Sequence, residues 1–167
     1  MKLLVIDDTP AYLEVAAAAL GEYEISFVSS YEAAAQAIES EKFHGVISDL
    51  FFPSNTDWAE FVRTNLTTLS EYKTDERSSL REKLSITENP AGLGIALLCK
   101  SRGIPFIIIT DGSRHKGNFG ELRNALIATG FITGGWDPLP KLVLYGNGQD
   151  KTRPEPWRTS LDHFVKF

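Results

Sequence analysis

Leu3-Leu4-Val5-Ile6-Asp7-Asp8, near the start of the chain, is a short apolar run that ends in two carboxylates. Four consecutive apolar residues are typical of a strand that is covered on both faces in a parallel sheet. Thr9 then offers a helix N-cap and Pro10 a first helical position, so we expect a helix that continues to Leu20 and is ended by Gly21. This segment therefore predicts a strand, a turn that carries two aspartates, and a helix.

Strands and helices are expected to alternate along the rest of the chain. The further strands are predicted at Glu24–Val28, Gly45–Ser48, Phe106–Ile109 and Leu142–Tyr145. The further helices are predicted at Tyr31–Ser40 with Ser30 as its N-cap, Ala91–Ser101, Phe119–Thr129 and Trp157–Phe167. Alternating elements of this kind favour right-handed crossovers. We therefore expect an α/β fold with a doubly wound, five-stranded parallel sheet.

Residues 54–89 do not fit a minimal unit of five strands. Apolar residues between Trp58 and Tyr72 recur at spacings of three and four, which indicates an amphipathic helix. We interpret 54–89 as a helical insertion between the third strand and the third helix, within a single domain that spans 1–167. The apolar stripe packs on this domain in the simplest interpretation, and a partner or dimer surface is the alternative.

Composition limits the classes of function. The net charge is −5 and Lys and Arg form no dense cluster, which argues against a nucleic-acid-binding surface. The N-terminal segment becomes acidic after four apolar residues, so we expect neither a signal peptide nor a membrane span. The single cysteine, Cys99, lies in an apolar helical segment and is expected to be a buried, inert thiol. A cytoplasmic protein is the resulting expectation.

Acidic residues follow two of the predicted strands. Asp7 and Asp8 end the first strand, Asp49 ends the third, and Thr110 ends the fourth. In open α/β sheets, ligands bind beyond the carboxyl ends of the strands. If the strand order is 2-1-3-4-5, these four side chains can converge, and the clustered carboxylates would favour a hard divalent cation such as Mg²⁺. The alternative is that Asp7 and Asp8 only stabilise the start of the first helix through its dipole.

Three segments resemble the receiver domain of two-component response regulators: Val5–Asp8, Ile47–Pro53 and Ile104–Gly112. The resemblance implies a flavodoxin-like sheet of order 2-1-3-4-5. It also implies that Asp49 is a phosphoacceptor and that Thr110 hydrogen-bonds the phosphoryl group and acts as a switch. Mg²⁺ would be bound by Asp7, Asp8, Asp49 and the backbone carbonyl of Phe51, with Asp7 acting through water.

The resemblance also implies partners. A sensor histidine kinase or a phosphotransfer protein would supply the phosphoryl group, and a downstream protein would receive the signal. Direct contact with nucleic acid or membrane is not expected, and a second copy of the chain is a further candidate partner. The chain would be a signalling receiver that slowly releases its phosphoryl group rather than an enzyme.

The sequence departs from the family pattern at two places. Receiver domains carry a lysine at the end of the fifth strand, where this chain has Leu144-Tyr145-Gly146-Asn147. Lys141, Lys151 and Lys116 are candidate substitutes, and the sequence does not single out one of them. Asp111 adds a negative charge beside Thr110, where receiver domains have a small residue.

These departures leave two other functions open. The first is an atypical receiver-fold interaction module that works without phosphorylation. The second is a phosphatase or phosphotransferase with Asp49 as nucleophile. The haloacid dehalogenase-like phosphatases need a second aspartate two residues after the nucleophile, and Phe51 at that position argues against this class.

Overall fold

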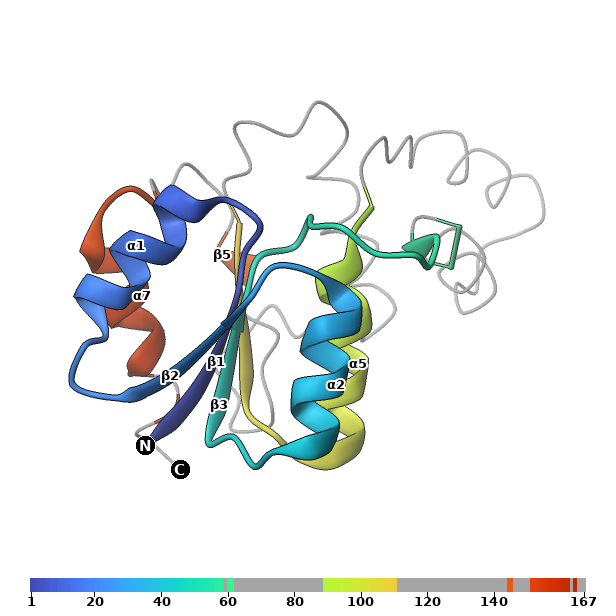
Figure 1. Ribbon diagram of the computed structural model, residues 1–167, viewed down its shortest axis with the longest axis horizontal. Helices are drawn as coiled ribbons and strands as arrows, with labels where there is room; N and C mark the ends of the chain where they lie inside the picture. The colour runs from blue at the N-terminus through green and yellow to red at the C-terminus, as the bar shows by residue number, and fades with distance from the viewer. Residues whose placement is uncertain (59, 62–88, 111–143, 146–150, 163, 165–167) are drawn as a thin grey trace, which may run out of the picture.

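A computed structural model describes residues 1–58, 60–61, 89–110, 144–145, 151–162 and 164. Its centre is a parallel sheet of order β2-β1-β3-β4-β5 (Figure 1). The strands are β1 (Lys2–Ile6), β2 (Glu24–Val28), β3 (Gly45–Ser48), β4 (Phe106–Ile109) and β5 (Leu144–Tyr145). The expected α/β class and the order 2-1-3-4 of the first four strands are confirmed. Only two residues of the predicted strand 142–145 are among those described.

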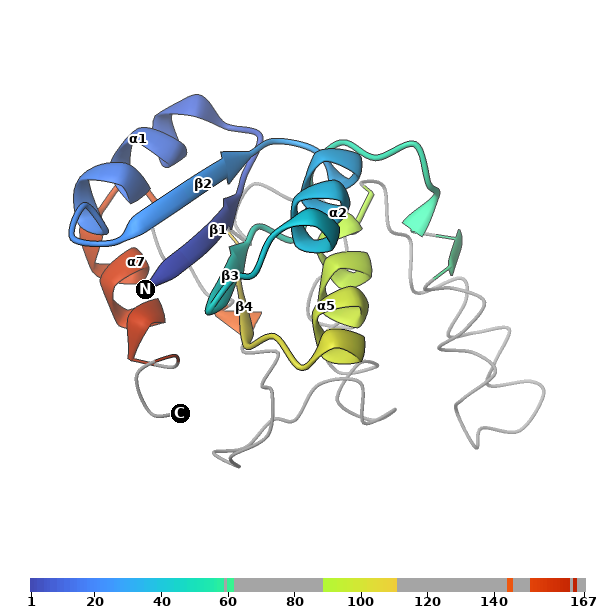
Figure 2. The same cartoon turned by 60° about the horizontal axis from the view of Figure 1, so that its bottom comes forward.

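Helices cover both faces of the sheet. The described helices are α1 (Pro10–Ala19), α2 (Tyr31–Ser40), α5 (Ala91–Arg102) and α7 (Pro154–Leu161). Figures 1 and 2 show α1 and α7 side by side on one face, and α2 and α5 side by side on the other. The predicted helix at 119–129 lies outside the described residues.

Two apolar clusters hold these layers together, and alternate residues of the same strands contribute to each. The cluster under α2 and α5 includes Leu4, Ile6, Val46, Ile108, Ile38, Leu93 and Cys99. The cluster under α1 and α7 includes Leu3, Val5, Ile47, Ile107, Tyr12, Leu20 and Trp157. All side chains of β1 from Leu3 to Ile6 are fully buried, as expected for a strand covered on both faces.

The register of the sheet sets the positions of the strand ends. Ile6 is aligned with Ser48 on β3, and Ser48 is aligned with Ile108 on β4. The residues that follow these strands therefore emerge beside one another at the carboxyl edge of the sheet. The backbone N–H of Asp49 donates to the carbonyl of Ile6 at 2.8 Å, which extends the pairing of β1 and β3 by one residue.

The helix ends confirm some local predictions and correct others. Ser30 caps α2 by accepting a hydrogen bond from the N–H of Ala33 at 3.3 Å. Thr9 occupies the N-cap position of α1, but its side chain makes no capping hydrogen bond. The last helix begins at Pro154 rather than Trp157, because proline suits the first turn of a helix, and it ends at Leu161 rather than Phe167.

The two ends of the predicted insertion are joined at Asn89. Its Oδ1 accepts a hydrogen bond from the N–H of Trp58 at 3.0 Å, and its Nδ2 donates to the carbonyl of Thr56 at 2.7 Å. The Trp58 ring packs against Gly94 on α5 and lies 5.0 Å from the ring of Tyr31. Residues 59 and 62–88 lie outside the described residues, so the helical insertion at 54–89 and the single-domain boundary stay predictions.

Cys99 is fully buried in the cluster under α2 and α5. Burial raises the pKa of its thiol to about 12, so the thiol stays protonated and unreactive at neutral pH. This agrees with the inert cysteine expected from the sequence.

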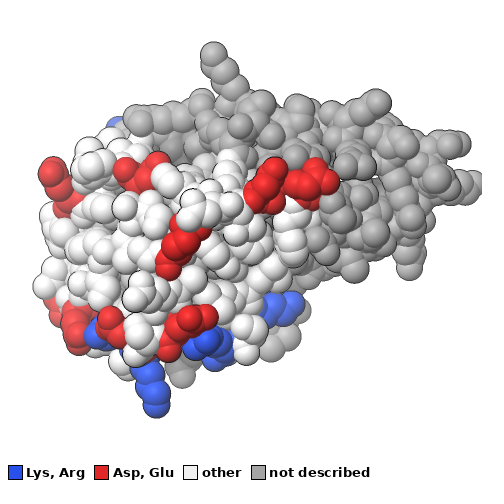
Figure 3. All heavy atoms as spheres, turned by 45° about the vertical axis from the view of Figure 1, so that its right-hand side comes forward, with Lys and Arg blue, Asp and Glu red and all other residues white. Residues whose placement is uncertain are grey.

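The surface carries charges of both signs. In the face shown in Figure 3, most of the visible Lys and Arg lie along the lower edge, and Asp and Glu occur both there and across the rest of the face. Lys2, at the amino end of β1, pairs with Glu41 at 2.7 Å and with Glu24 at 3.0 Å, and both carboxylates raise its pKa. Among the described residues, no helix is long and apolar enough to cross a membrane.

Candidate phosphoryl and metal site

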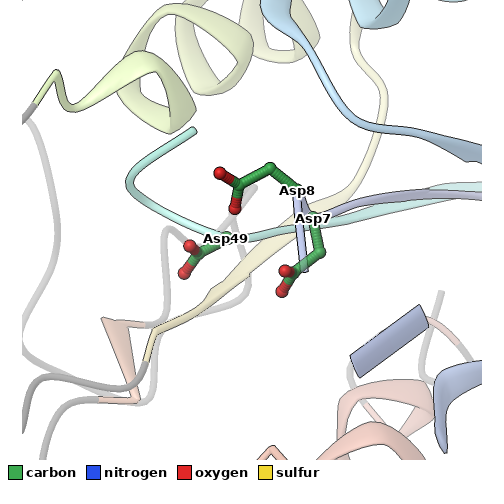
Figure 4. Close-up of side chains that lie close together, drawn as sticks. All are labelled: Asp7, Asp8 and Asp49. Atoms are coloured by element: carbon green, nitrogen blue, oxygen red, sulfur yellow. The ribbon is translucent and has the colours of Figure 1, made fainter. Parts of the chain in front are cut away.

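Three carboxylates meet at the carboxyl edge of the sheet. Asp7 and Asp8 follow β1, and Asp49 follows β3 (Figure 4). One oxygen from each of these side chains lies within 4.8 Å of the other two. Asp7 and Asp49 are buried, whereas Asp8 is exposed. The structure thus brings together the three aspartates that the sequence placed at neighbouring strand ends.

Asp7 is held rigidly by two hydrogen bonds. Its Oδ1 accepts the backbone N–H of Thr9 at 2.9 Å, and its Oδ2 accepts Nζ of Lys151 at 2.7 Å. β1 ends at Ile6, and the first bond fixes the turn from Asp7 to Thr9 that leads into α1. Asp7 therefore serves the structure of the β1–α1 turn as well as the acidic cluster.

Lys151 inserts its ammonium group between two of the carboxylates. Its Nζ lies 2.7 Å from Oδ2 of Asp7 and 3.0 Å from Oδ1 of Asp49, and its side chain is only 2% exposed. Lys151 lies beyond β5, in the turn just before α7. The sequence had left it as one of three candidates. A usable signal was present, because Lys151 follows the last strand and precedes the helix that starts at Pro154, so it lies at the carboxyl edge of the sheet.

Charge and burial oppose each other in this cluster. Burial raises the pKa of Asp49, and the nearby charge of Asp7 raises it further, against the lowering effect of Lys151. Burial lowers the pKa of Lys151, but Asp49 and Asp7 outweigh burial, so the pKa rises and the ammonium stays charged. In its fully ionised form, the cluster would hold three carboxylates against the one ammonium of Lys151, an excess of two negative charges. This is the charge that a divalent cation would neutralise.

The backbone at Asp49 is fixed from two sides. The hydroxyl of Ser48 donates to the Asp49 carbonyl at 2.6 Å. On the other side, the N–H of Gly92 donates to the carbonyl of Leu50 at 2.9 Å. A Cβ at position 92 would lie 2.3 Å from the Asp49 carbonyl oxygen, so only glycine allows α5 to approach this closely.

Thr110 and Phe51 complete the set of residues named from the sequence. Thr110 follows β4 and is fully buried, and its hydroxyl finds no hydrogen-bond partner among the described residues. A buried hydroxyl without a partner is costly, which suits a group that serves a ligand. Phe51 is half-buried against the cluster under α2 and α5, and the metal-binding role of its carbonyl stays a prediction.

Several other residues considered from the sequence lie outside the described residues. They are Asp111, Lys116 and Lys141. The extra charge of Asp111 beside Thr110 therefore remains an observation on the sequence. Lys151 is the candidate lysine that the described structure brings to the cluster.

Comparison with solved structures identifies the fold. The signal receiver domain of an HD domain-containing protein from Pseudomonas fluorescens Pf-5 is 15% identical, with a TM-score of 0.51 over 99% of this chain and 98% of that one. The chemotaxis response regulator CheY4 of Vibrio cholerae is 15% identical, with a TM-score of 0.50 over 98% and 97% of the two chains. The isolated REC domain of RcsB from Salmonella enterica serovar Typhimurium, in the presence of phosphomimetic BeF3−, is 13% identical, with a TM-score of 0.55 over 99% and 88%.

Comparison of the sequence with protein-family models and with curated proteins finds no match. At these low identities the structural matches establish the fold and nothing further. The chain therefore has the flavodoxin-like fold of response-regulator receiver domains, as the three sequence segments predicted.

Proposed function

We propose that this chain is a phosphoacceptor receiver module of two-component signalling, in which Asp49 takes a phosphoryl group from a phosphohistidine. The partner that supplies it would be a sensor histidine kinase or a phosphotransfer protein. One observation carries the proposal: a buried ammonium, that of Lys151, lies 3.0 Å from Asp49 inside a cluster of three carboxylates. A nucleophilic carboxylate beside a fixed cation and a divalent-metal site is the arrangement that transfer of a phosphoryl anion requires.

The donor set fits Mg²⁺. The three side chains offer only hard carboxylate oxygens, which this cation prefers, and their closest oxygens lie within 4.8 Å of one another. Asp8 and Asp49 would bind the metal directly, together with the Phe51 carbonyl. Asp7, whose two oxygens already accept hydrogen bonds from Thr9 and Lys151, would act through water. When bound, Mg²⁺ supplies positive charge that neutralises phosphoryl oxygens.

The proposed transfer uses the carboxylate of Asp49 as nucleophile. One of its oxygens forms a bond to phosphorus while the bond from phosphorus to the imidazole nitrogen of the donor histidine breaks. The electron pair of the broken bond stays on the imidazole, and the product on this chain is an acyl phosphate. The Lys151 ammonium, released in part from Asp49, pairs with a phosphoryl oxygen.

Thr110 would respond to phosphorylation of Asp49. Its buried hydroxyl, which has no partner among the described residues, would donate to a phosphoryl oxygen. That hydrogen bond would favour a second orientation of Thr110, which would alter the surface offered to a downstream protein. The proposal thus describes a switch whose output is partner docking rather than catalysis.

Two departures favour an interaction module that works without phosphorylation: the absence of a lysine at the end of the fifth strand, and the charge of Asp111. Lys151 removes the first argument, because its ammonium reaches the carboxylate of Asp49 from the turn before α7, and Asp111 lies outside the described residues. We therefore keep the phosphoacceptor function as the conclusion.

The test uses acetyl phosphate and beryllofluoride, a mimic of the phosphoryl group. Wild type should bind beryllofluoride only with Mg²⁺ present and should acquire one acid-labile phosphoryl group from acetyl phosphate, detected by intact-mass spectrometry. Asp49→Asn should lose both reactions, and Asp8→Asn should lose Mg²⁺ binding. Asp162→Asn, an exposed aspartate outside the cluster, is the matched control and should behave as wild type. Equal labelling of wild type and Asp49→Asn would contradict the proposal.

A further inference from the structure

The position of Lys151 in the chain does not by itself hold its side chain in the site. It lies six positions after Tyr145, the last residue of β5, rather than at the strand end. A lysine side chain has four flexible carbons, and its conformational freedom must be lost if the ammonium is to stay at one point. The 2% exposure of Lys151 shows that the surrounding residues do confine it.

Trp157 holds the backbone of Lys151. The indole Nε1 donates a hydrogen bond to the Lys151 carbonyl at 3.0 Å. Trp157 lies on α7, is 1% exposed, and packs in the cluster between that helix, α1 and the sheet. The indole is rigid and buried, so the bond ties the turn that carries Lys151 to the apolar core.

Tyr12 holds the other end of the same side chain. Nζ of Lys151 lies 4.6 Å from the centre of the Tyr12 ring, within the range of a cation–π contact. Tyr12 lies on α1 and is 4% exposed, so water does not weaken this contact. The ring attracts the ammonium without binding it through a hydrogen bond, which leaves its protons to the carboxylates of Asp7 and Asp49.

We propose that Tyr12 and Trp157 are positioning residues for Lys151, and that together they replace the anchoring a lysine would have at a strand end. We call them the lysine clamp. The proposal rests on the proposed function, because it assigns the clamp the task of holding the ammonium where a phosphoryl oxygen would be bound. Among the described residues, the clamp is built by α1 and α7, so this helical layer braces the cation, while α5 on the opposite face braces the backbone of Asp49.

The clamp has a consequence that a purely structural role lacks. A fixed ammonium competes with Mg²⁺ for the negative charge of Asp7 and Asp49, but it attracts an anionic phosphoryl mimic. Loosening Lys151 should therefore strengthen Mg²⁺ binding and weaken beryllofluoride binding. General loss of stability would weaken both.

The experiment compares Tyr12→Leu, Trp157→Phe, Tyr12→Phe and Lys151→Met in the full chain. Tyr12→Leu removes the ring, Trp157→Phe removes the hydrogen-bond donor but keeps an aromatic side chain, and Tyr12→Phe keeps the ring face as the matched control. Calorimetry measures the Kd of Mg²⁺ and, at saturating Mg²⁺, the Kd of beryllofluoride. Tyr12→Leu should bind beryllofluoride about tenfold more weakly and Mg²⁺ more tightly. Trp157→Phe should show the same signs with smaller changes, and Lys151→Met the largest.

A second measurement tests the clamp without metal or mimic. In protein labelled with ¹⁵N at lysine side chains, a buried ammonium held by two carboxylates should give a slowly exchanging signal that is absent in Lys151→Met. Its hydrogen exchange should become at least about tenfold faster in Tyr12→Leu and in Trp157→Phe, and should be unchanged in Tyr12→Phe.

The outcomes separate the two proposals. If wild type binds no beryllofluoride, the proposed function fails, and the exchange measurement still decides the clamp. The clamp is overturned if Tyr12→Leu and Trp157→Phe leave ammonium exchange as in wild type. It is also overturned if both variants weaken Mg²⁺ and beryllofluoride binding in parallel with a loss of thermal stability.

Discussion

The carboxylate of Asp49 is buried beside that of Asp7, and Lys151 offsets this cost only in part. Burial is the largest cause of its raised pKa, ahead of the opposing charge of Lys151. The folded chain therefore favours the protonated form of Asp49 more than the unfolded chain does. By linkage, this group contributes stability that is complete below its unfolded pKa near 3.8 and is lost as pH rises through the raised folded value.

This residue gives a prediction about stability and pH. Without metal at neutral pH, Asp49→Asn should raise Tm by about 2–4 °C, which corresponds to ~1 kcal/mol in a chain of this size. The difference should shrink as pH falls through the raised pKa of Asp49 in the folded chain, because wild-type Asp49 takes up its proton there. Thermal denaturation in EDTA across this pH range measures it.

The control for this experiment is Glu22→Gln, which removes one negative charge at an exposed position. It should leave Tm nearly unchanged at every pH, since exposed charges contribute little. Addition of Mg²⁺ should stabilise wild type more than Asp49→Asn, because a ligand stabilises the state that binds it. If Asp49→Asn is less stable than wild type at neutral pH, the ion pair with Lys151 stabilises the folded chain by more than the burial of Asp49 costs.

At the scale of elements, α5 connects the site with the base of the insertion. Gly92, in its first turn, packs against the carbonyl of Asp49, and Gly94 packs against the Trp58 ring. Seven of its residues are buried, and its exposed residues, Lys100, Ser101 and Arg102, lie together at its carboxyl end. The helix ends at Gly103, whose φ of 66° is the left-handed conformation that favours glycine.

Two glycines of α5 allow its steric role to be tested. Gly92→Ala should destabilise the chain by about 1–3 kcal/mol, because its Cβ can be accommodated only if the backbone at Asp49 moves. It should also weaken Mg²⁺ binding by about tenfold, equivalent to ~1.4 kcal/mol of lost ligand interaction. Urea denaturation and Mg²⁺ titration measure the two effects.

Gly103→Ala is the matched control at the other end of the same helix. Nothing lies within 4 Å of its added Cβ, so its cost of about 1 kcal/mol comes from backbone strain alone. Its Mg²⁺ affinity should equal that of wild type. If both variants lose affinity in proportion to stability, the close approach of Gly92 to Asp49 has no specific role in the site.

At the scale of the whole molecule, the described part of the chain, which does not include 62–88, already supplies the acidic cluster and two apolar clusters. The ends of the predicted insertion lie close together, because Asn89 bonds to both Thr56 and Trp58. At this junction, the ring centroids of Trp58 and Phe61 lie 5.2 Å apart in an edge-to-face arrangement, and both side chains pack in the cluster under α2 and α5. The sheet and its acidic cluster should therefore form without the central part of the insertion.

Replacement of residues 62–88 by about six Gly and Ser residues tests this independence. We expect cooperative unfolding and a Mg²⁺ Kd within about threefold of wild type, which corresponds to a change of ~0.6 kcal/mol in binding free energy. Circular dichroism and Mg²⁺ titration are the measurements. Loss of Mg²⁺ binding in a folded variant would mean that the inserted residues contribute to the site.

Asn89→Ala in the full chain is the companion variant. It removes the two hydrogen bonds that close the base of the insertion and should lower stability by about 1–3 kcal/mol. Its Mg²⁺ affinity should stay unchanged, because Asn89 lies outside the acidic cluster.

Sequence reasoning succeeded where local patterns carry the information. The apolar runs of β1, β3 and β4 are local, and so are the aspartates that end β1 and β3, because strand ends in a parallel sheet share one edge. The N-cap of α2 was also correct, since capping involves neighbouring residues. Helix ends were less certain: Pro154 starts α7 earlier than the apolar pattern suggested.

The order of elements places Lys151 at the carboxyl edge of the sheet, but only the tertiary structure decided that its ammonium reaches the acidic cluster. Lys151 and Asp7 are 144 positions apart in the chain, and no local pattern relates them. Their contact depends on where α7 packs against α1, and on Tyr12 and Trp157 holding the lysine there. Periodicity encodes which residues face the core, but a contact between distant turns exists only once the helices have packed around the sheet.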